Sequence, residues 1–207
     1  MALIFFLGKV FIISFSGAMQ PGPVTATAIT MGSRSRWAGA LLAVGHGIVE
    51  FPLIVLMIIG LGTIFRSNAA QIAIGFAGGA VLVLMAIQMF VSSRANTNAQ
   101  AKISRDRPIL TGIVLSVGNP YFLVWWATVG LALAIQAKGF GIWAFAIFAV
   151  VHWLVDLLWF GALSWASFRG SALLGPKSQP IVLAICSVAL FGFGLFFIYN
   201  AASILLK

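Results

Sequence analysis

Six long apolar stretches, separated by the few charged residues, are the feature that most limits what this chain can fold into. Only 7% of the residues are charged and 62% are hydrophobic, whereas a soluble domain carries about 25% charged residues. A spanning helix needs roughly 20 mostly apolar residues, and each stretch is at least that long. A transmembrane barrel would instead show alternating segments of about ten residues. We therefore predict an all-α integral membrane protein. The predicted spans are Val10–Ser33, Trp37–Phe65, Ser67–Ser93, Pro108–Ala137, Gly139–Phe168 and Ser178–Leu206.

The basic residues are distributed unevenly between the loops, and this predicts the orientation. Excess Lys and Arg mark the cytoplasmic side of a membrane protein. The richer set is Arg34, Arg36, Arg94, Lys102, Arg105, Arg107, Arg169 and Lys177, and the poorer set is Lys9, Arg66, Lys138 and Lys207. We expect a multi-pass protein of the cell (cytoplasmic) membrane with both termini extracytoplasmic. The net charge of +9 then reflects loops beside a lipid bilayer, and no nucleic-acid partner is expected.

Two small observations limit processing and cofactors. Met1–Gly8 has no charged side chain, whereas a cleavable signal begins with a basic region, so the first segment is predicted to be a retained helix. Cys186 is the single cysteine, which excludes an internal disulfide and a multi-thiolate zinc site. No cofactor is predicted.

A repeated pattern divides the chain into two halves. His46 and Glu50 form a His-x-x-x-acid pair, and His152 and Asp156 repeat it in a chain with only two histidines and three acids. Each pair falls in the second span of its half. Each half holds three spans, an odd number, so the second copy enters the membrane upside down, as in many secondary transporters. We expect one membrane domain, residues 1–207, built from two inverted three-helix repeats. The repeats are residues 1–93 and 108–207, joined by a cytoplasmic linker at 94–107.

Prolines are expected to interrupt the first span of each half, with the alternative that Pro120 stands near the start of the fourth helix. Gly17–Pro23 reads GAMQPGP, and Ser116–Pro120 reads SVGNP. Proline removes a backbone donor and clashes with the preceding turn, and irregular backbone inside a membrane is tolerated only where it is buried in protein or lines a cavity. The half-helix after each break has free N–H groups at its positive end, which suits an anion. A packing kink is the alternative. The candidate binding residues are Gln20, Pro21, Gly22, Pro23, Asn119 and Pro120.

The two His/acid pairs are the strongest candidates for chemistry. Residues four apart share one helix face, so His46 lies beside Glu50, and His152 beside Asp156. A charged group at the bilayer centre costs roughly 2.5–3.5 kcal/mol, so these side chains are expected to face inward with partners. We predict that the pairs meet near the midplane, where an acid binds a substrate ammonium or a proton and histidine relays that proton. A structural clamp between helices is the alternative.

These motifs together resemble the lysine-exporter (LysE/RhtB-type) translocator family over essentially the whole chain. The most specific part is Pro21-Gly22-Pro23 followed by Gly32, Gly39 and Gly45, with Gly-Asn-Pro in the fourth span. The resemblance implies a six-span exporter of amino acids or related metabolites, driven by the proton gradient. We expect it to work by alternating access. The chain has Val24 where members often carry an acid and Tyr121 where many carry Lys, so no particular substrate is predicted. The motif positions implied by the resemblance are Gln20, Pro21, Gly22, Pro23, Asn119 and Pro120.

Two other function classes use the same residues. His46, Glu50, His152 and Asp156 could ligate a divalent metal ion if they converge, which would make the chain a metal transporter. An intramembrane enzyme is not predicted, because the sequence has no His-Glu-x-x-His or Gly-x-Ser-x-Gly motif.

Small residues and tryptophans add packing signals. Gly39, Ala43 and Gly47 recur every fourth residue, and Gly75 and Gly79 do the same. Small residues at this spacing let helices approach closely, either inside the chain or across a homodimer. Of the tryptophans, Trp125 and Trp126 beside the Asn-Pro break are the ones predicted to contact substrate.

Overall fold

The structure is a computed structural model that describes residues 1–207 except 21, 62–63, 65–66, 96–106, 175–177 and 207. All secondary structure in the described residues is helical, which confirms the predicted all-α class. Pro21 and most of the predicted linker 94–107 lie outside the described residues.

The described helices are long and apolar enough to cross a membrane. Five qualify singly, and a bent pair formed by Ala2–Ala18 and Pro23–Gly32 would make a sixth span. The number of spans therefore agrees with the six apolar stretches of the sequence. The five single spans are Ala38–Gly60, Asn68–Gln88, Tyr121–Gly139, Ile142–Gly170 and Ser187–Leu205.

The first span is broken as predicted. Helix α1 (Ala2–Ala18) and helix α2 (Pro23–Gly32) meet at 77°. Pro23 occupies the first turn of α2, where its missing N–H leaves no backbone acceptor unpaired. The predicted start at Val10 is wrong, because α1 begins at Ala2 and runs through Lys9. The exposed Lys9 ammonium donates to Gln136 Oε1 at 3.3 Å, so this charge does not end the helix.

The predicted fourth span, Pro108–Ala137, is divided at Gly118 and Asn119. Helix α7 (Pro108–Val117) ends there and α8 (Pro120–Trp125) begins, with Asn119 in an extended conformation between them. The chain continues through the π-helical segment η2 (Trp126–Gly130) and α9 (Leu131–Gly139). The segment Tyr121–Gly139 is long enough to span by itself, so α7 is an extra half-length helix.

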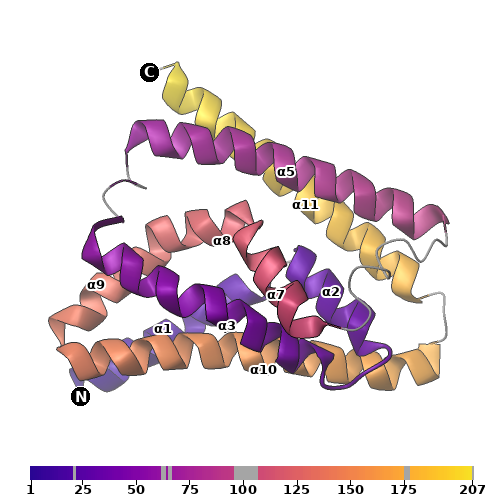
Figure 1. The fold of residues 1–207 in the computed structure, drawn as a ribbon, viewed down its shortest axis with the longest axis horizontal. Coiled ribbons are helices and arrows are strands. Elements are labelled where there is room, and N and C mark those ends of the chain that lie inside the picture. The colour runs from indigo at the N-terminus through magenta and orange to yellow at the C-terminus, as the bar shows by residue number, and fades with distance from the viewer. Residues whose placement is uncertain (21, 62–63, 65–66, 96–106, 175–177, 207) are drawn as a thin grey trace.

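The remaining helices form two layers around the breaks (Figure 1). Helices α5 (Asn68–Ala95) and α11 (Ser178–Leu205) pack along each other as one layer. The other layer contains α1, α3 (Ala38–Leu56, continued by η1, Met57–Leu61) and α10 (Ile142–Leu174). Helix α2 contacts both layers, and α8 packs on α5 and reaches α10 through the stacking of Trp125 on His152. Both chain ends lie at the same end of the molecule (Figure 1).

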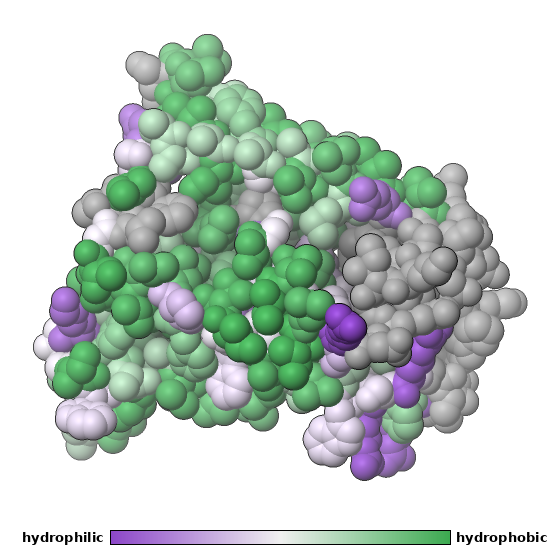
Figure 2. Space-filling model, viewed as in Figure 1, coloured by the Kyte–Doolittle hydropathy of each residue, from purple (hydrophilic) through white to green (hydrophobic). Residues whose placement is uncertain are grey.

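The surface of these layers is apolar, as expected of a lipid-facing protein. Figure 2 shows hydrophobic residues across the middle of one face, with hydrophilic residues mainly near its ends. Exposed side chains such as Ile48, Leu158 and Val188 contribute to this apolar surface. A soluble protein rarely exposes apolar patches larger than a few hundred Å², so a bilayer is the environment this surface fits.

The small-residue stripes pack inside the chain. Gly39 lies against the backbone of Phe160 on α10, and Gly47 against the indole of Trp153 on the same helix. Gly75 and Gly79 face α11 in the same way. Of the two uses predicted for these stripes, internal packing is the one confirmed.

Candidate functional site

The two His/acid pairs meet in a central cavity of about 80 Å³. All four side chains line it, and their residues are nearly inaccessible, from 0% exposure for Glu50 to 7% for His46. Helix α3 supplies His46 and Glu50, and α10 supplies His152 and Asp156. The predicted convergence of the pairs is confirmed, because α3 packs directly against α10.

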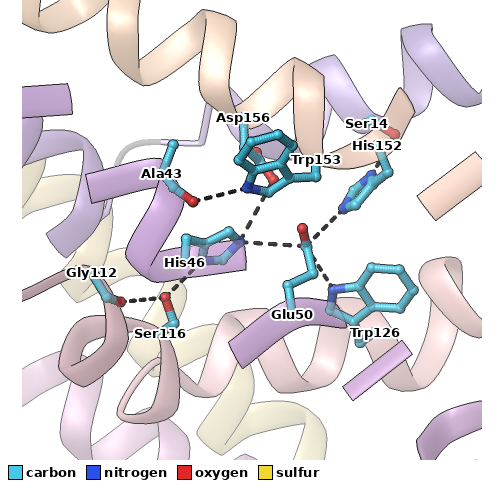
Figure 3. Close-up of polar contacts among 10 residues, drawn as sticks. All are labelled: Ser14, Ala43, His46, Glu50, Gly112, Ser116, Trp126, His152, Trp153 and Asp156. Atoms are coloured by element: carbon cyan, nitrogen blue, oxygen red, sulfur yellow. Dashed lines mark hydrogen bonds and ion pairs between the residues drawn. The ribbon is translucent and has the colours of Figure 1, made fainter. Parts of the chain in front are cut away.

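Glu50 is the centre of the cluster (Figure 3). Its Oε1 accepts hydrogen bonds from Trp126 Nε1 at 3.2 Å and lies 3.1 Å from His152 Nε2. The same oxygen lies 3.4 Å from His46 Nε2. Asp156 is less engaged, because among the described residues its one polar contact joins Oδ2 to His46 Nε2, at 3.6 Å. The two acids are therefore not equivalent: Glu50 joins both halves of the chain, and Asp156 stands at the edge of the network.

Each histidine is held by a serine from the first span of the other half. His46 Nδ1 lies 2.6 Å from Ser116 Oγ on α7, and His152 Nδ1 lies 2.6 Å from Ser14 Oγ on α1. Both serines are buried. These contacts fix the plane of each imidazole ring so that its Nε2 points at the carboxylates (Figure 3).

The hydrogen bonds of Ser116 determine where His46 carries a proton. The Ser116 hydroxyl donates to the carbonyl oxygen of Gly112 at 2.6 Å. A serine has one hydroxyl hydrogen, so Ser116 Oγ must accept from His46 Nδ1–H. The Nε2 of His46 then faces two carboxylates that cannot donate when ionised. A further proton, held on Nε2 or on one of those acids, is needed to complete this contact.

His152 has no such requirement. The Ser14 hydroxyl has no other acceptor among the described residues, so it can donate to His152 Nδ1. The Nε2–H of the neutral ring then donates to Glu50 Oε1. The ring also stacks on Trp125, with centroids 4.9 Å apart and planes 17° from parallel. The neutral tautomer of His152 therefore satisfies all its contacts, and the two histidines differ in proton demand.

One carboxylate oxygen in the cluster is left without a partner. Glu50 Oε2 is fully buried and accepts no hydrogen bond from the described residues. Gln20 Oε1 is in the same situation at the break between α1 and α2. A buried unpaired carboxylate oxygen is costly, and both residues line the cavity. The cavity thus offers acceptors to a ligand that carries hydrogen-bond donors.

The two helix breaks differ at the cavity. The N-terminus of α2 has Gly22 as its cap and no side-chain hydrogen bond, and Gly22, Pro23 and Thr25 line the cavity. At α8, the Asn119 side chain accepts from Tyr121 N–H at 3.1 Å, so this end caps itself. The anion site predicted at both breaks is therefore better supported at α2 than at α8. Pro21 and the side chain of Pro120 lie outside the described residues.

Part of the cluster has a geometry that suits a cation. Three buried residues each offer one ligand atom, and these atoms lie within 4.8 Å of one another: His46, Glu50 and Asp156. The fourth candidate ligand, His152, is outside this group of three.

Sequence reasoning underestimated three neighbours of the cluster. Ser116 was predicted only as part of the second helix break, and Ser14 precedes the first break without belonging to its proline motif. Trp126 was predicted only to contact substrate; it lines the cavity and also donates to Glu50. Buried serines about one or two turns before each proline break are the signal that could have pointed to the histidine partners.

A helical membrane protein with broken spans around a buried ionisable cavity has the architecture of a secondary transporter. The chain belongs to the LysE type translocator family, whose model matches residues 15–201. It is therefore a transporter of amino acids or related compounds. Searches of curated proteins and of solved structures returned no match.

Proposed function

We propose that the protein exports a small amino acid or related zwitterion in exchange for protons, by alternating access around the central cavity. The observation that carries this proposal is the unpartnered Oε2 of Glu50, a buried carboxylate oxygen in the wall of the cavity. A substrate ammonium supplies the missing donors. The substrate carboxylate then lies toward the uncapped N-terminus of α2, where backbone N–H groups favour an anion.

The residues that line the cavity also indicate which kind of substrate side chain fits there. Among the described residues that line the cavity none is Lys or Arg, and Leu82, Leu190 and Phe193 complete its wall. An anionic side chain would meet two carboxylates without a compensating cation. An apolar side chain would meet the leucines and the phenylalanine, so we propose a neutral amino acid with an apolar side chain.

The hydrogen bonds of His46 support proton coupling. Its contact with Glu50 and Asp156 requires one proton beyond those fixed by Ser116. A substrate ammonium at Glu50 adds a positive charge to the same small space, and the two charges repel. We infer that substrate and proton bind in alternation, which is the condition for exchange.

The reciprocal serine contacts support the inverted repeat. His46 of the first half contacts Ser116 of the second, and His152 of the second contacts Ser14 of the first. The packing follows the same rule, because α3 packs on α7 and α10 packs on α1. A pair of inverted three-helix units, residues 1–93 and 108–207, explains this exchange of partners.

Transport by purified protein in liposomes tests the proposal. Vesicles are loaded with a labelled neutral amino acid and diluted into more acidic buffer. One pH unit supplies about 1.4 kcal/mol per proton, so a one-for-one exchange shifts the final distribution about tenfold. Collapsing the gradient with a proton–potassium exchanger is expected to remove this shift. Efflux that ignores both the gradient and its collapse would contradict proton exchange.

The grouping of His46, Glu50 and Asp156 favours divalent-metal transport as the second candidate. The same vesicles, loaded with a metal-sensitive dye, distinguish the two. We expect the dye to show no response to zinc or manganese. We also expect the Asp156→Asn variant to bind the amino acid through Glu50 but to lose the effect of the pH gradient on its transport. A fast dye response that Asp156→Asn abolishes would assign the site to metal instead.

A further inference from the structure

A second, larger cavity lies beside the central one. It has a volume of about 890 Å³ and is lined by α1, α5, α11 and the segment from α8 to α9. Its described lining is mostly apolar, and its polar residues are Lys9, Gln71, Thr128, Asn200 and Ser203. It contains none of the His/acid residues, so it is not an extension of the cluster.

The two cavities lie in series. On α1, Lys9 and Ile13 line the second cavity, and Ser14 and Gly17 the central one. On α11 the order is reversed along the chain, with residues 196–204 lining the second cavity and Leu190 and Phe193 the central one. Because α1 starts and α11 finishes at the same end of the molecule (Figure 1), the second cavity lies toward the end that holds both termini.

A thin aromatic layer separates the cavities. Tyr121 and Phe193 line the central cavity, and Phe197 lines the second. The Tyr121 ring lies 6.0 Å from Phe193 and 6.3 Å from Phe197, between ring centroids. These distances are those of directly packed aromatic rings. A path between the cavities at this point would need new rotamers of these rings, which are discrete staggered states of each side chain.

The other end of the central cavity is closed in a different way, by helix backbones in contact. A Cβ on Gly32 would lie 2.5 Å from Ser164 Cα, and one on Gly39 would overlap the Phe160 backbone. A Cβ on Gly112 would overlap the Leu42 carbonyl oxygen. Opening this end requires whole helices to separate. One end of the central cavity is therefore closed by packed side chains, and the other by packed helix backbones.

We propose that the second cavity is the vestibule through which substrate leaves, and that Tyr121, Phe193 and Phe197 form its gate. This inference rests on the proposed transport function. The vestibule takes the same zwitterion as the central site. Lys9 is the charged residue in its described lining and attracts the substrate carboxylate, while the apolar lining accommodates the side chain. The structure is thus closed toward the vestibule by side chains alone.

Thiol accessibility in the full-length protein tests the gate. In a Cys186→Ser background, Thr128→Cys places a reporter in the vestibule and Ala18→Cys places one in the central cavity. A charged, membrane-impermeant thiol reagent is applied to each face of the membrane in turn. We expect Thr128→Cys to react from one face, and Ala18→Cys to react slowly from both. Adding Phe197→Ala is expected to raise the Ala18→Cys rate roughly tenfold or more from the face that reaches Thr128→Cys, because a rarely open path becomes permanently open.

Matched variants keep the outcome interpretable. Phe191→Ala truncates an exposed phenylalanine of the same helix and is expected to leave the Ala18→Cys rate unchanged. Phe193→Ala is the second gate variant if Phe197→Ala does not fold. An unchanged Ala18→Cys rate in both gate variants, or a rate that rises only from the face opposite the one that reaches Thr128→Cys, overturns the gate. The thiol reaction rates are measured without substrate, so they test the gate independently of the proposed function. If the gate variants behave as expected but the protein transports no amino acid, the proposed substrate is wrong and the gate proposal still holds.

Discussion

Glu50→Gln is expected to lower transport by at least about 30-fold without unfolding the protein. The amide is nearly isosteric with the carboxylate, and its oxygen can still accept from Trp126 and His152 at the position of Oε1. The change acts at Oε2, the unpartnered acceptor of the cavity, where the amide puts an N–H₂ donor. Losing one member of a buried charge pair costs about 2–5 kcal/mol, and each 1.4 kcal/mol is a factor of ten. The measurement is the initial rate of efflux from the liposomes described above.

The remaining acid of the chain provides the control. Asp106 lies in the predicted linker, and Asp106→Asn removes the same charge outside the span that carries the cavity. We expect Asp106→Asn to transport at the rate of the unmodified protein. If Glu50→Gln elutes as a folded protein and also transports at that rate, Glu50 has a structural role, and the helix-clamp interpretation is correct.

Gly39→Ala is expected to destabilise the protein strongly, although it adds only a single methyl group. The added Cβ would lie 2.5 Å from the carbonyl carbon of Phe160 and 2.8 Å from Ser164 Oγ. Both neighbours belong to α10, so α3 and α10 must move apart. Overpacking of this kind costs about 1–3 kcal/mol, which lowers the midpoint temperature by roughly 2–12 °C. Thermal unfolding of the purified protein, followed by size-exclusion chromatography after heating, measures it.

A control glycine on α10 tests whether crowding at Gly39, or any glycine-to-alanine change in these helices, causes the loss of stability. Gly161 lies in α10, and a Cβ there would meet nothing within 4 Å. Alanine favours helix by up to about 1 kcal/mol over glycine, so Gly161→Ala is expected to leave stability unchanged or to raise it slightly. Equal losses in the two variants would show that close contact of α3 and α10 at Gly39 is not the cause.

The spans and their breaks were predictable because both follow from local chemistry. A bilayer accepts only helices and closed barrels, and long unbroken apolar runs indicate helices. Pro23 and Pro120 each occupy the first turn of a new helix. The error at the first span came from using Lys9 as a boundary. A lysine can lie on a helix side and reach a partner such as Gln136, which no pattern within the span reveals.

The sequence predicted that the His/acid pairs face inward and meet, but it did not predict which of their atoms contact one another. Four-residue spacing places His46 and Glu50 on one face, and the cost of buried charge implies that they point inward. The sequence could not show that the Glu50 carboxylate contacts Trp126 and both histidines. It also could not show that Asp156 contacts one histidine, His46, among the described residues. That asymmetry depends on side-chain distances between helices that are far apart in the chain.

The sequence by itself determined that this protein is a bundle of membrane helices with two proline breaks, since hydropathy and proline chemistry act within a few residues. It also carried the family motifs, because they are contiguous. Only the tertiary structure decided which serine holds which histidine, which carboxylate oxygen lacks a partner, and which end of the cavity is closed by side chains. Those features arise from contacts between helices up to 138 positions apart in the chain, and their geometry is set when the helices pack together.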